Sequence, residues 1–234
     1  MLPKFIISSQ QTFAAMNSFT EENYIKAIYK LNEKYGNNVT TNAIAEKTNT
    51  KAASVTDMLK RLSSKELINY KKYKGVTLTA KGEKLALNII RKHRLWEMFL
   101  VEKLEFKWDE VHEIAEELEH INSEKLIEQL DKFLDYPKVD PHGDPIPDSK
   151  GKVNITKSLL LSKSGKGYIY TMTGVVDHSP AFLKYLEQSG INLGCIIKVK
   201  DIIEFDNSLH ITINKNKHVF ISNEVAKNIL VLKK

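Results

Sequence analysis

Histidine and glutamate side chains gather in one stretch of this chain. Five of its seven histidines lie between His93 and His178. Four candidate ligands stand at i, i+4, i+7 and i+8, and they are His112, Glu116, Glu119 and His120. On an α-helix this spacing places them within an arc of about 100°. His93 and Glu97 form a further i, i+4 pair. These nitrogen and oxygen donors suit a divalent ion such as Mn²⁺ or Fe²⁺, and the lack of thiolates disfavours a soft metal.

The same residues allow two other interpretations. A glutamate-rich helix exposed to solvent could carry these histidines incidentally. A ferritin-like di-iron enzyme requires two E-x-x-H pairs and two further glutamates. This sequence has only one such pair, formed by Glu117 and His120. The run from His112 to Glu116 also lacks the final histidine of an H-E-x-x-H zinc site. A carboxylate and histidine metalloenzyme is therefore the less favoured alternative.

Two predicted helices position these ligands. The first spans residues 80–101 and carries His93 and Glu97. The second begins at Asp109, a plausible N-cap, and runs to about residue 122. Its apolar residues lie beside the ligand arc and are predicted to face the core, namely Val111, Ala115, Leu118 and Ile121. Glu113 and Glu117 point further out and are expected to be solvated.

The N-terminal part reads as three helices and a hairpin. Ser18 and Glu21 have the spacing of a capping box, and the predicted first helix buries Tyr24, Ile28, Leu31 and Tyr35. A short helix at residues 41–48 and a third at residues 52–65 follow. Residues 68–79 form two alternating runs about a Lys-Gly turn. This order predicts a winged helix-turn-helix.

Polar side chains on this part suit a nucleic acid. The third helix presents Lys51, Ser54, Thr56, Asp57 and Lys60 away from its apolar stripe. The hairpin carries Lys71, Lys72, Tyr73 and Lys74. Lysines of a wing contact phosphates, and polar side chains of a recognition helix contact base edges. A lysine-rich hairpin by itself is equally compatible with a solvated turn.

Charge divides the chain into three blocks. The 234 residues carry a net charge of +6, but residues 1–85 carry +7, residues 86–150 carry −7 and residues 151–234 carry +6. A basic block suits a polyanion and an acidic block suits a cation. One cysteine, Cys195, excludes an internal disulfide, and no apolar run approaches the length of a membrane span. A cytoplasmic protein without a membrane partner is expected.

Prolines mark the next boundary. Four of the six prolines lie within residues 136–152, which predicts a linker or an irregular ordered loop. Beyond it, alternating runs at residues 196–205, 209–213 and 218–221 predict strands. The expected division is an extension at 1–16, a DNA-binding domain at 17–85, a helical domain at 86–150 and a β-domain at 151–234. The β-domain alone would also suit an iron-transport accessory or a protein-interaction module.

Taken in order, these segments resemble the diphtheria toxin repressor (DtxR/MntR) family of metal-dependent bacterial transcription repressors. The resemblance covers residues 17–234 and rests on ENYIKAIY at 22–29, SVT at 54–56, YKGVTLT at 73–79, RKHRL at 91–95, VHEIAEELEH at 111–120 and PHGDPIP at 141–147. It implies a mainly α (α+β) chain with an N-terminal winged helix-turn-helix, a helical dimerisation and metal-binding domain, and a C-terminal SH3-like β-barrel of the FeoA type.

The resemblance also implies two metal sites per subunit. The regulatory ion would take Asn23 with Glu116, Glu119 and His120. The second ion would take His93, Glu97 and His112, with help from Asp140, His142 and Asp177. Glu116 stands where iron-sensing members have a cysteine, and this harder ligand favours Mn²⁺, with Fe²⁺ as the alternative. Asn23 brings no charge, so Glu21 or Glu22 could replace it, and Lys26 stands where some manganese sensors have a glutamate.

The implied function is a metal-activated repressor. The metal-loaded homodimer would bind palindromic operators in double-stranded DNA and control metal homeostasis. An iron-responsive regulator of the same fold is the alternative.

Overall fold

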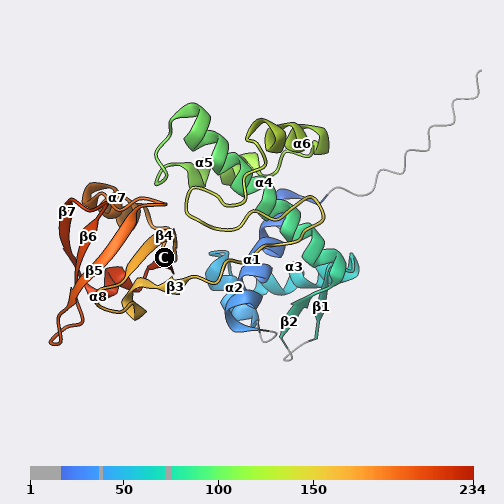
Figure 1. Cartoon of the computed structure of the whole chain (residues 1–234). Helices are drawn as coiled ribbons and strands as arrows, with labels where there is room; N and C mark the ends of the chain where they lie inside the picture. Colours follow the sequence, from blue (N-terminus) through green and yellow to red (C-terminus); the bar gives the residue numbers. More distant parts are fainter. Residues whose placement is uncertain (1–16, 37–38, 72–74) are drawn as a thin grey trace, which may run out of the picture. The chain divides into compact units, whose positions relative to one another are not determined.

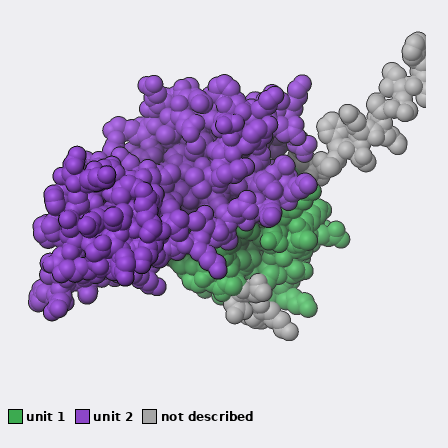
Figure 2. Space-filling view, in the orientation of Figure 1, with its two compact units in different colours: residues 1–86 green, residues 87–234 purple. Residues whose placement is uncertain are grey.

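The computed structural model describes residues 17–36, 39–71 and 75–234. The chain forms two compact units, of which the first ends at Ala86 and the second runs from Leu87 to Lys234 (Figure 2). Helix α4 (Ala80–Leu104) is continuous across this boundary. None of the helices in the described ranges is both long enough and apolar enough to cross a membrane.

Three helices build the first unit (Figure 1). They are α1 (Phe19–Tyr35), α2 (Thr41–Lys47) and α3 (Ala52–Ser64). Ser18 Oγ accepts a hydrogen bond from the Glu21 amide, and Glu21 Oε2 accepts one from the Ser18 amide, so the predicted capping box is confirmed. Thr40 caps α2 in the same way through the Ala43 amide. Helices α1 and α2 thus begin where a side chain satisfies one of their first amides, whereas Lys51 at the start of α3 makes no such side-chain bond.

A two-stranded hairpin completes this unit. Strands β1 (Ile68–Tyr70) and β2 (Val76–Leu78) are antiparallel, with Ile68 opposite Leu78. The fully buried core includes Ile25, Ile28, Ile44, Val55, Leu59 and Leu62. The winged helix-turn-helix is confirmed. The expectation that Tyr35 is buried is wrong, since this last residue of α1 is 54% exposed.

The helices of the second unit are α4, α5 (Val111–Leu118) and α6 (Glu124–Phe133). Leu95, Trp96, Ala115, Ile127 and Leu130 pack together in their core. Helix α5 is shorter than predicted, because its N-cap position is Glu110 and its last helical residue is Leu118. The predicted N-cap is wrong for a specific reason: the Asp109 carboxylate is buried and faces Lys184 Nζ at 3.5 Å.

The proline-rich segment after α6 is an irregular ordered loop held by two arginines of α4. Arg91 donates to Pro147 O and pairs with Asp131, both at 2.7 Å. Arg94 donates to the Asp144 carboxylate at 2.9 Å. Val139 and Pro145 form an isolated antiparallel bridge within the loop. Guanidinium groups thus fix backbone that forms no regular element of its own.

The C-terminal part is a six-stranded antiparallel sheet with short helices. Its elements are β3 (Leu159–Leu160), η1 (Leu161–Lys163), β4 (Ile169–Val175), α7 (Pro180–Ser189), β5 (Ile196–Ile202), β6 (Leu209–Ile213), β7 (Lys217–Ile221), α8 (Asn223–Ala226) and β8 (Ile229–Lys233). The strand order is β3-β8-β4-β5-β6-β7, so β3 and β7 are the edges. One face buries Met172, Ile197, Ile211 and Val231. The expected C-terminal β-fold is confirmed.

Candidate metal centre

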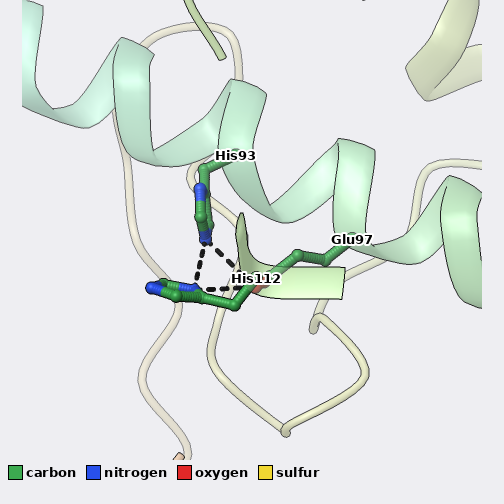
Figure 3. A group of neighbouring side chains, drawn as sticks. All are labelled: His93, Glu97 and His112. Carbon is green, nitrogen blue, oxygen red and sulfur yellow. Dashed lines mark hydrogen bonds and ion pairs between the residues drawn. The ribbon is translucent and has the colours of Figure 1, made fainter. Parts of the chain in front are cut away.

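Three predicted ligands meet between α4 and α5 (Figure 3). His93 Nε2 lies 3.0 Å from Glu97 Oε1 and 3.2 Å from His112 Nδ1. His112 Nδ1 lies 3.4 Å from the same Glu97 oxygen. His93 and Glu97 are buried, whereas the His112 side chain is 47% exposed. One ligand atom from each residue therefore converges on a common point at the edge of solvent.

Glu119 fixes the orientation of His93. Its Oε2 atom lies 2.7 Å from His93 Nδ1, and Glu119 is fully buried. A carboxylate accepts a hydrogen bond, so Nδ1 of His93 carries a proton. Its other nitrogen, Nε2, faces Glu97 and His112. A carboxylate behind an imidazole is the usual arrangement that orients a metal-bound histidine.

A second, overlapping group shares Glu97. It consists of Glu97, Asp140 and His142, all of them buried. His142 Nε2 donates to the Trp108 carbonyl at 2.8 Å, which turns Nδ1 toward Glu97 Oε2 at 3.8 Å and Asp140 Oδ1 at 4.0 Å. This buried Nδ1 has no hydrogen-bond partner among the described residues. An unpartnered nitrogen between two carboxylates is the donor arrangement that a divalent cation completes.

The pKa values of Glu97, Asp140 and His142 depend on one another, because the three side chains are buried close together. Burial alone would raise the pKa of Glu97, but its interactions with His112, His142 and His93 hold this pKa well below its usual range. Burial and the negative charges of Glu97 and Asp144 raise the pKa of Asp140. Burial acts to lower the pKa of His142, yet its interactions with Glu97 and Asp140 raise it to about 9. Without a metal, a proton on His142 therefore balances the carboxylates at neutral pH.

The remaining predicted ligands lie outside these two groups. Glu116 Oε1 lies 3.5 Å from His112 Nε2, and His120 Nε2 lies 4.0 Å from Glu119 Oε1. Asp177 is partly buried, and its Oδ1 accepts from the Ser179 amide at the start of α7. Asn23 is on α1 in the first unit. The roles of all these residues stay predictions.

The groups that support the ligands were not predicted from the sequence. Arg94 holds the loop of Asp140 and His142, and the Trp108 carbonyl sets the ring of His142. His178 stacks on His142 with ring centroids 4.9 Å apart. Arg94 and Asp144 are 50 residues apart in the chain, and Trp108 and His142 are 34 apart, so no local spacing indicates these contacts. The only local signal is the RKHRL run, in which Arg91 and Arg94 flank His93.

The predicted DNA-binding residues of α3 lie at the surface of the first unit. Lys51, Ser54, Asp57 and Lys60 are exposed, and the Thr56 hydroxyl donates to the Ala52 carbonyl. Lys60 Nζ pairs with Asp57 at 3.1 Å. Lys71 is exposed just after β1. The predicted contacts Lys72, Tyr73 and Lys74 lie outside the described residues.

Three family models match the chain. The model described as iron dependent repressor, N-terminal DNA binding domain, matches residues 16–76. The model described as iron dependent repressor, metal binding and dimerisation domain, matches residues 79–148. A FeoA domain model matches residues 159–233.

Individual proteins are similar to it over different lengths. The iron-dependent repressor IdeR of Mycobacterium tuberculosis is 36% identical over 128 residues, which are 55% of this chain and 55% of that protein. The HTH-type transcriptional regulator MntR of Oceanobacillus iheyensis is 34% identical over 119 residues, 51% of this chain and 80% of that protein. A solved manganese-dependent transcriptional repressor in complex with manganese matches 92% of this chain and 100% of its own, with 33% identity and a TM-score of 0.83. The match spans about half the length of the IdeR relatives.

Proposed function

Because the chain belongs to the DtxR/MntR family of metal-dependent, DNA-binding repressors, we propose that it is a Mn²⁺-activated transcription repressor. The family consists of repressors and not of enzymes, which decides against the metalloenzyme alternative. The observation that carries the proposal is the convergence of three imidazoles on the buried carboxylate of Glu97. Nitrogen and oxygen ligands without a thiolate suit Mn²⁺. Cys195, the one cysteine, is buried in the core of the β-domain.

The proposed ligands fall into two sets. His93, Glu97 and His112, together with Asp140 and His142, would hold one ion, and Asp177 is a further proposed donor. Asn23, Glu116, Glu119 and His120 are the proposed ligands of the regulatory ion. Glu119 also orients His93, so the same buried carboxylate would bind the regulatory ion and hydrogen-bond to a ligand of the other ion. An ion that binds one conformer better than another raises the population of that conformer, here the one that binds DNA.

The proposed partners are double-stranded operator DNA and a second copy of the chain. Helix α3 would lie in a major groove with Ser54 and Asp57 near base edges, while lysines of the wing would contact phosphates. A twofold dimer would then require a palindromic operator. The second unit exposes large apolar side chains that suit a dimer contact, among them Leu104, Leu126, Phe133 and Tyr136.

A selection experiment tests this function without a known operator. Random DNA duplexes would be bound to the full chain at fixed ionic strength, once with Mn²⁺ and once with a chelator. We expect a palindromic sequence to be enriched only with Mn²⁺. Equal enrichment in both arms, or none in either, would show that the chain is not a metal-activated repressor.

The second candidate is an iron-responsive regulator, which the similarity to IdeR favours. Glu116 is the residue that distinguishes the two. Replacing it by cysteine supplies a softer ligand, so we expect Glu116→Cys to raise the DNA-binding response to Fe²⁺ relative to Mn²⁺. An unchanged ratio of the two responses would mean that this ligand does not set the metal preference.

A further inference from the structure

Two histidines of the β-domain meet outside the centre described above. His210 lies on β6 and His218 on the edge strand β7 (Figure 1). His210 Nε2 and His218 Nδ1 are 3.3 Å apart. Leu209, Ile211 and Ile213 of β6 alternate into the core, so His210 and Thr212 point to the opposite face of the sheet. His218 is directly opposite Thr212 and shares that outer face.

The separation of the two nitrogens fits one shared ion. A Zn–N bond is about 2.0–2.1 Å, and two such bonds at the tetrahedral angle place the nitrogens about 3.3 Å apart. The corresponding nitrogens of His93 and His112 are separated by 3.2 Å. The outer pair therefore has the same spacing as the two imidazoles of the candidate metal centre.

The outer face of the sheet also holds the rings in place. His210 stacks on Phe220, the residue opposite it on β7, with ring centroids 4.5 Å apart and planes inclined by 12°. On the other side, Asp201 of β5 lies opposite His210. The Asp201 carboxylate is fixed by Lys166 Nζ at 2.6 Å and interacts electrostatically with His210. A stacked ring loses little rotational freedom when it binds an ion, and a nearby carboxylate favours a cation.

We propose that His210 and His218 form a surface site for Zn²⁺ or a similar imidazole-binding divalent ion, with water completing the coordination. Two imidazoles without a first-sphere carboxylate prefer Cu²⁺, Ni²⁺ or Zn²⁺ to Mn²⁺. The site is thus chemically distinct from the centre around Glu97 and goes beyond the proposed function. It would let the β-domain bind a metal that the regulatory sites are not built to sense.

Competition between the full chain and a chromophoric chelator for Zn²⁺ tests this site. The variants are His210→Gln and His218→Gln, with Lys200→Gln as the control because it changes an exposed residue of the same sheet. We expect wild type and control to bind one Zn²⁺ more per chain than either histidine variant, or to bind it at least about tenfold more tightly. Equal stoichiometry and affinity in all four proteins would overturn the proposal.

A second measurement uses wild-type protein, so its outcome does not depend on whether the variants fold. In wild-type protein, the ring proton resonances of all seven histidines can be followed by NMR as Zn²⁺ is added. The variants serve only to assign His210 and His218. We expect both resonances to shift together as Zn²⁺ is added. Zn²⁺ shifts confined to the other histidines would reject the site.

Discussion

Glu97 is the residue on which the candidate metal centre depends most. Its carboxylate belongs to both groups of candidate ligands, and His93, His112 and His142 all interact with it. A buried carboxylate that meets three imidazoles serves as a hydrogen-bond acceptor without a metal and as a charged ligand with one. Among the described residues, Glu97 is the only one that belongs to both groups of candidate ligands.

Replacing Glu97 by glutamine therefore tests the centre. The amide keeps the shape but removes the charge and one lone-pair oxygen, so we expect Mn²⁺ affinity at this centre to fall by at least about tenfold. Equilibrium dialysis of the purified chain measures it. Glu113→Gln is the matched control, because Glu113 lies on the exposed side of α5. If Glu97→Gln bound Mn²⁺ as tightly as the control, the centre would be misassigned.

The raised pKa of His142 predicts a pH dependence. Its pKa is about 9 in the folded chain against an ordinary value of 6.5. The protonated form therefore stabilises the metal-free fold below about pH 6.5, and this contribution is lost as pH rises through about 9. An ion that binds Nδ1 must displace this proton, so Mn²⁺ affinity should increase across the same interval. Calorimetry in buffers of different ionisation enthalpy measures the released proton. Wild type and His142→Gln releasing equal numbers of protons would contradict this account.

At the scale of elements, strand β4 holds the loop that carries Asp140 and His142. The Val175 amide donates to the His142 carbonyl at 3.0 Å. Gly143 has a φ of +90°, and a Cβ atom there would lie 2.1 Å from the Thr173 carbonyl oxygen. The close approach of two backbones thus requires a glycine at this position. The β-domain thereby helps to place ligands that belong to the preceding segment.

Gly143→Ala should therefore impair both stability and metal binding. Backbone strain of this kind costs about 1–3 kcal/mol, and the steric clash adds to it. Gly167→Ala is a control, because Gly167 has a similar φ of +87° but nothing within 4 Å of an added Cβ. Urea unfolding and Mn²⁺ titration measure the two effects. Equal losses in both variants would mean that the contact with β4 is unimportant.

Helix α3 and the wing are expected to differ in their effect on DNA binding. Ser54→Ala changes a side chain that faces base edges in the proposed complex, so it should alter sequence preference. Lys71→Ala removes a phosphate contact, so it should weaken binding to all duplexes and lower the salt dependence. Measuring the binding of both variants to a panel of duplexes at several salt concentrations distinguishes altered sequence preference from uniform weakening. Uniform weakening by both variants would refute the assignment of α3 as recognition helix.

Local patterns predicted the starts of α1 to α4 but not the limits of α5. The Ser18 capping box and the alternation of β6 are short-range features, and the structure confirms both. Asp109 instead faces Lys184 of α7, and Glu119 and His120 follow the last helical turn. Glu119 interacts with His93, which is 26 residues away. Such long-range contacts override local propensity. Spacing suggested the His93 and Glu97 pair, and the family resemblance joined His112 to it, but neither indicated what orients His93.

For the whole molecule, two of the three charge blocks now have separate explanations. The +7 of residues 1–85 includes the exposed side chains of Lys51, Lys60 and Lys71. The −7 of residues 86–150 includes Glu97, Glu119 and Asp140, which are buried around histidines, and exposed acids such as Glu113 that keep the surface polar. A metal-activated repressor requires a binding region for DNA and another for a cation. The proposed function further requires that the two binding events be coupled.

The most direct test is an equilibrium titration of a selected operator duplex at fixed ionic strength, with and without saturating Mn²⁺. Coupling of the usual size, about 1–3 kcal/mol, predicts an operator affinity at least about fivefold higher with Mn²⁺. By reciprocity, Mn²⁺ affinity must then rise by the same factor when the operator is present. An operator affinity that is equal with and without Mn²⁺ would contradict the account.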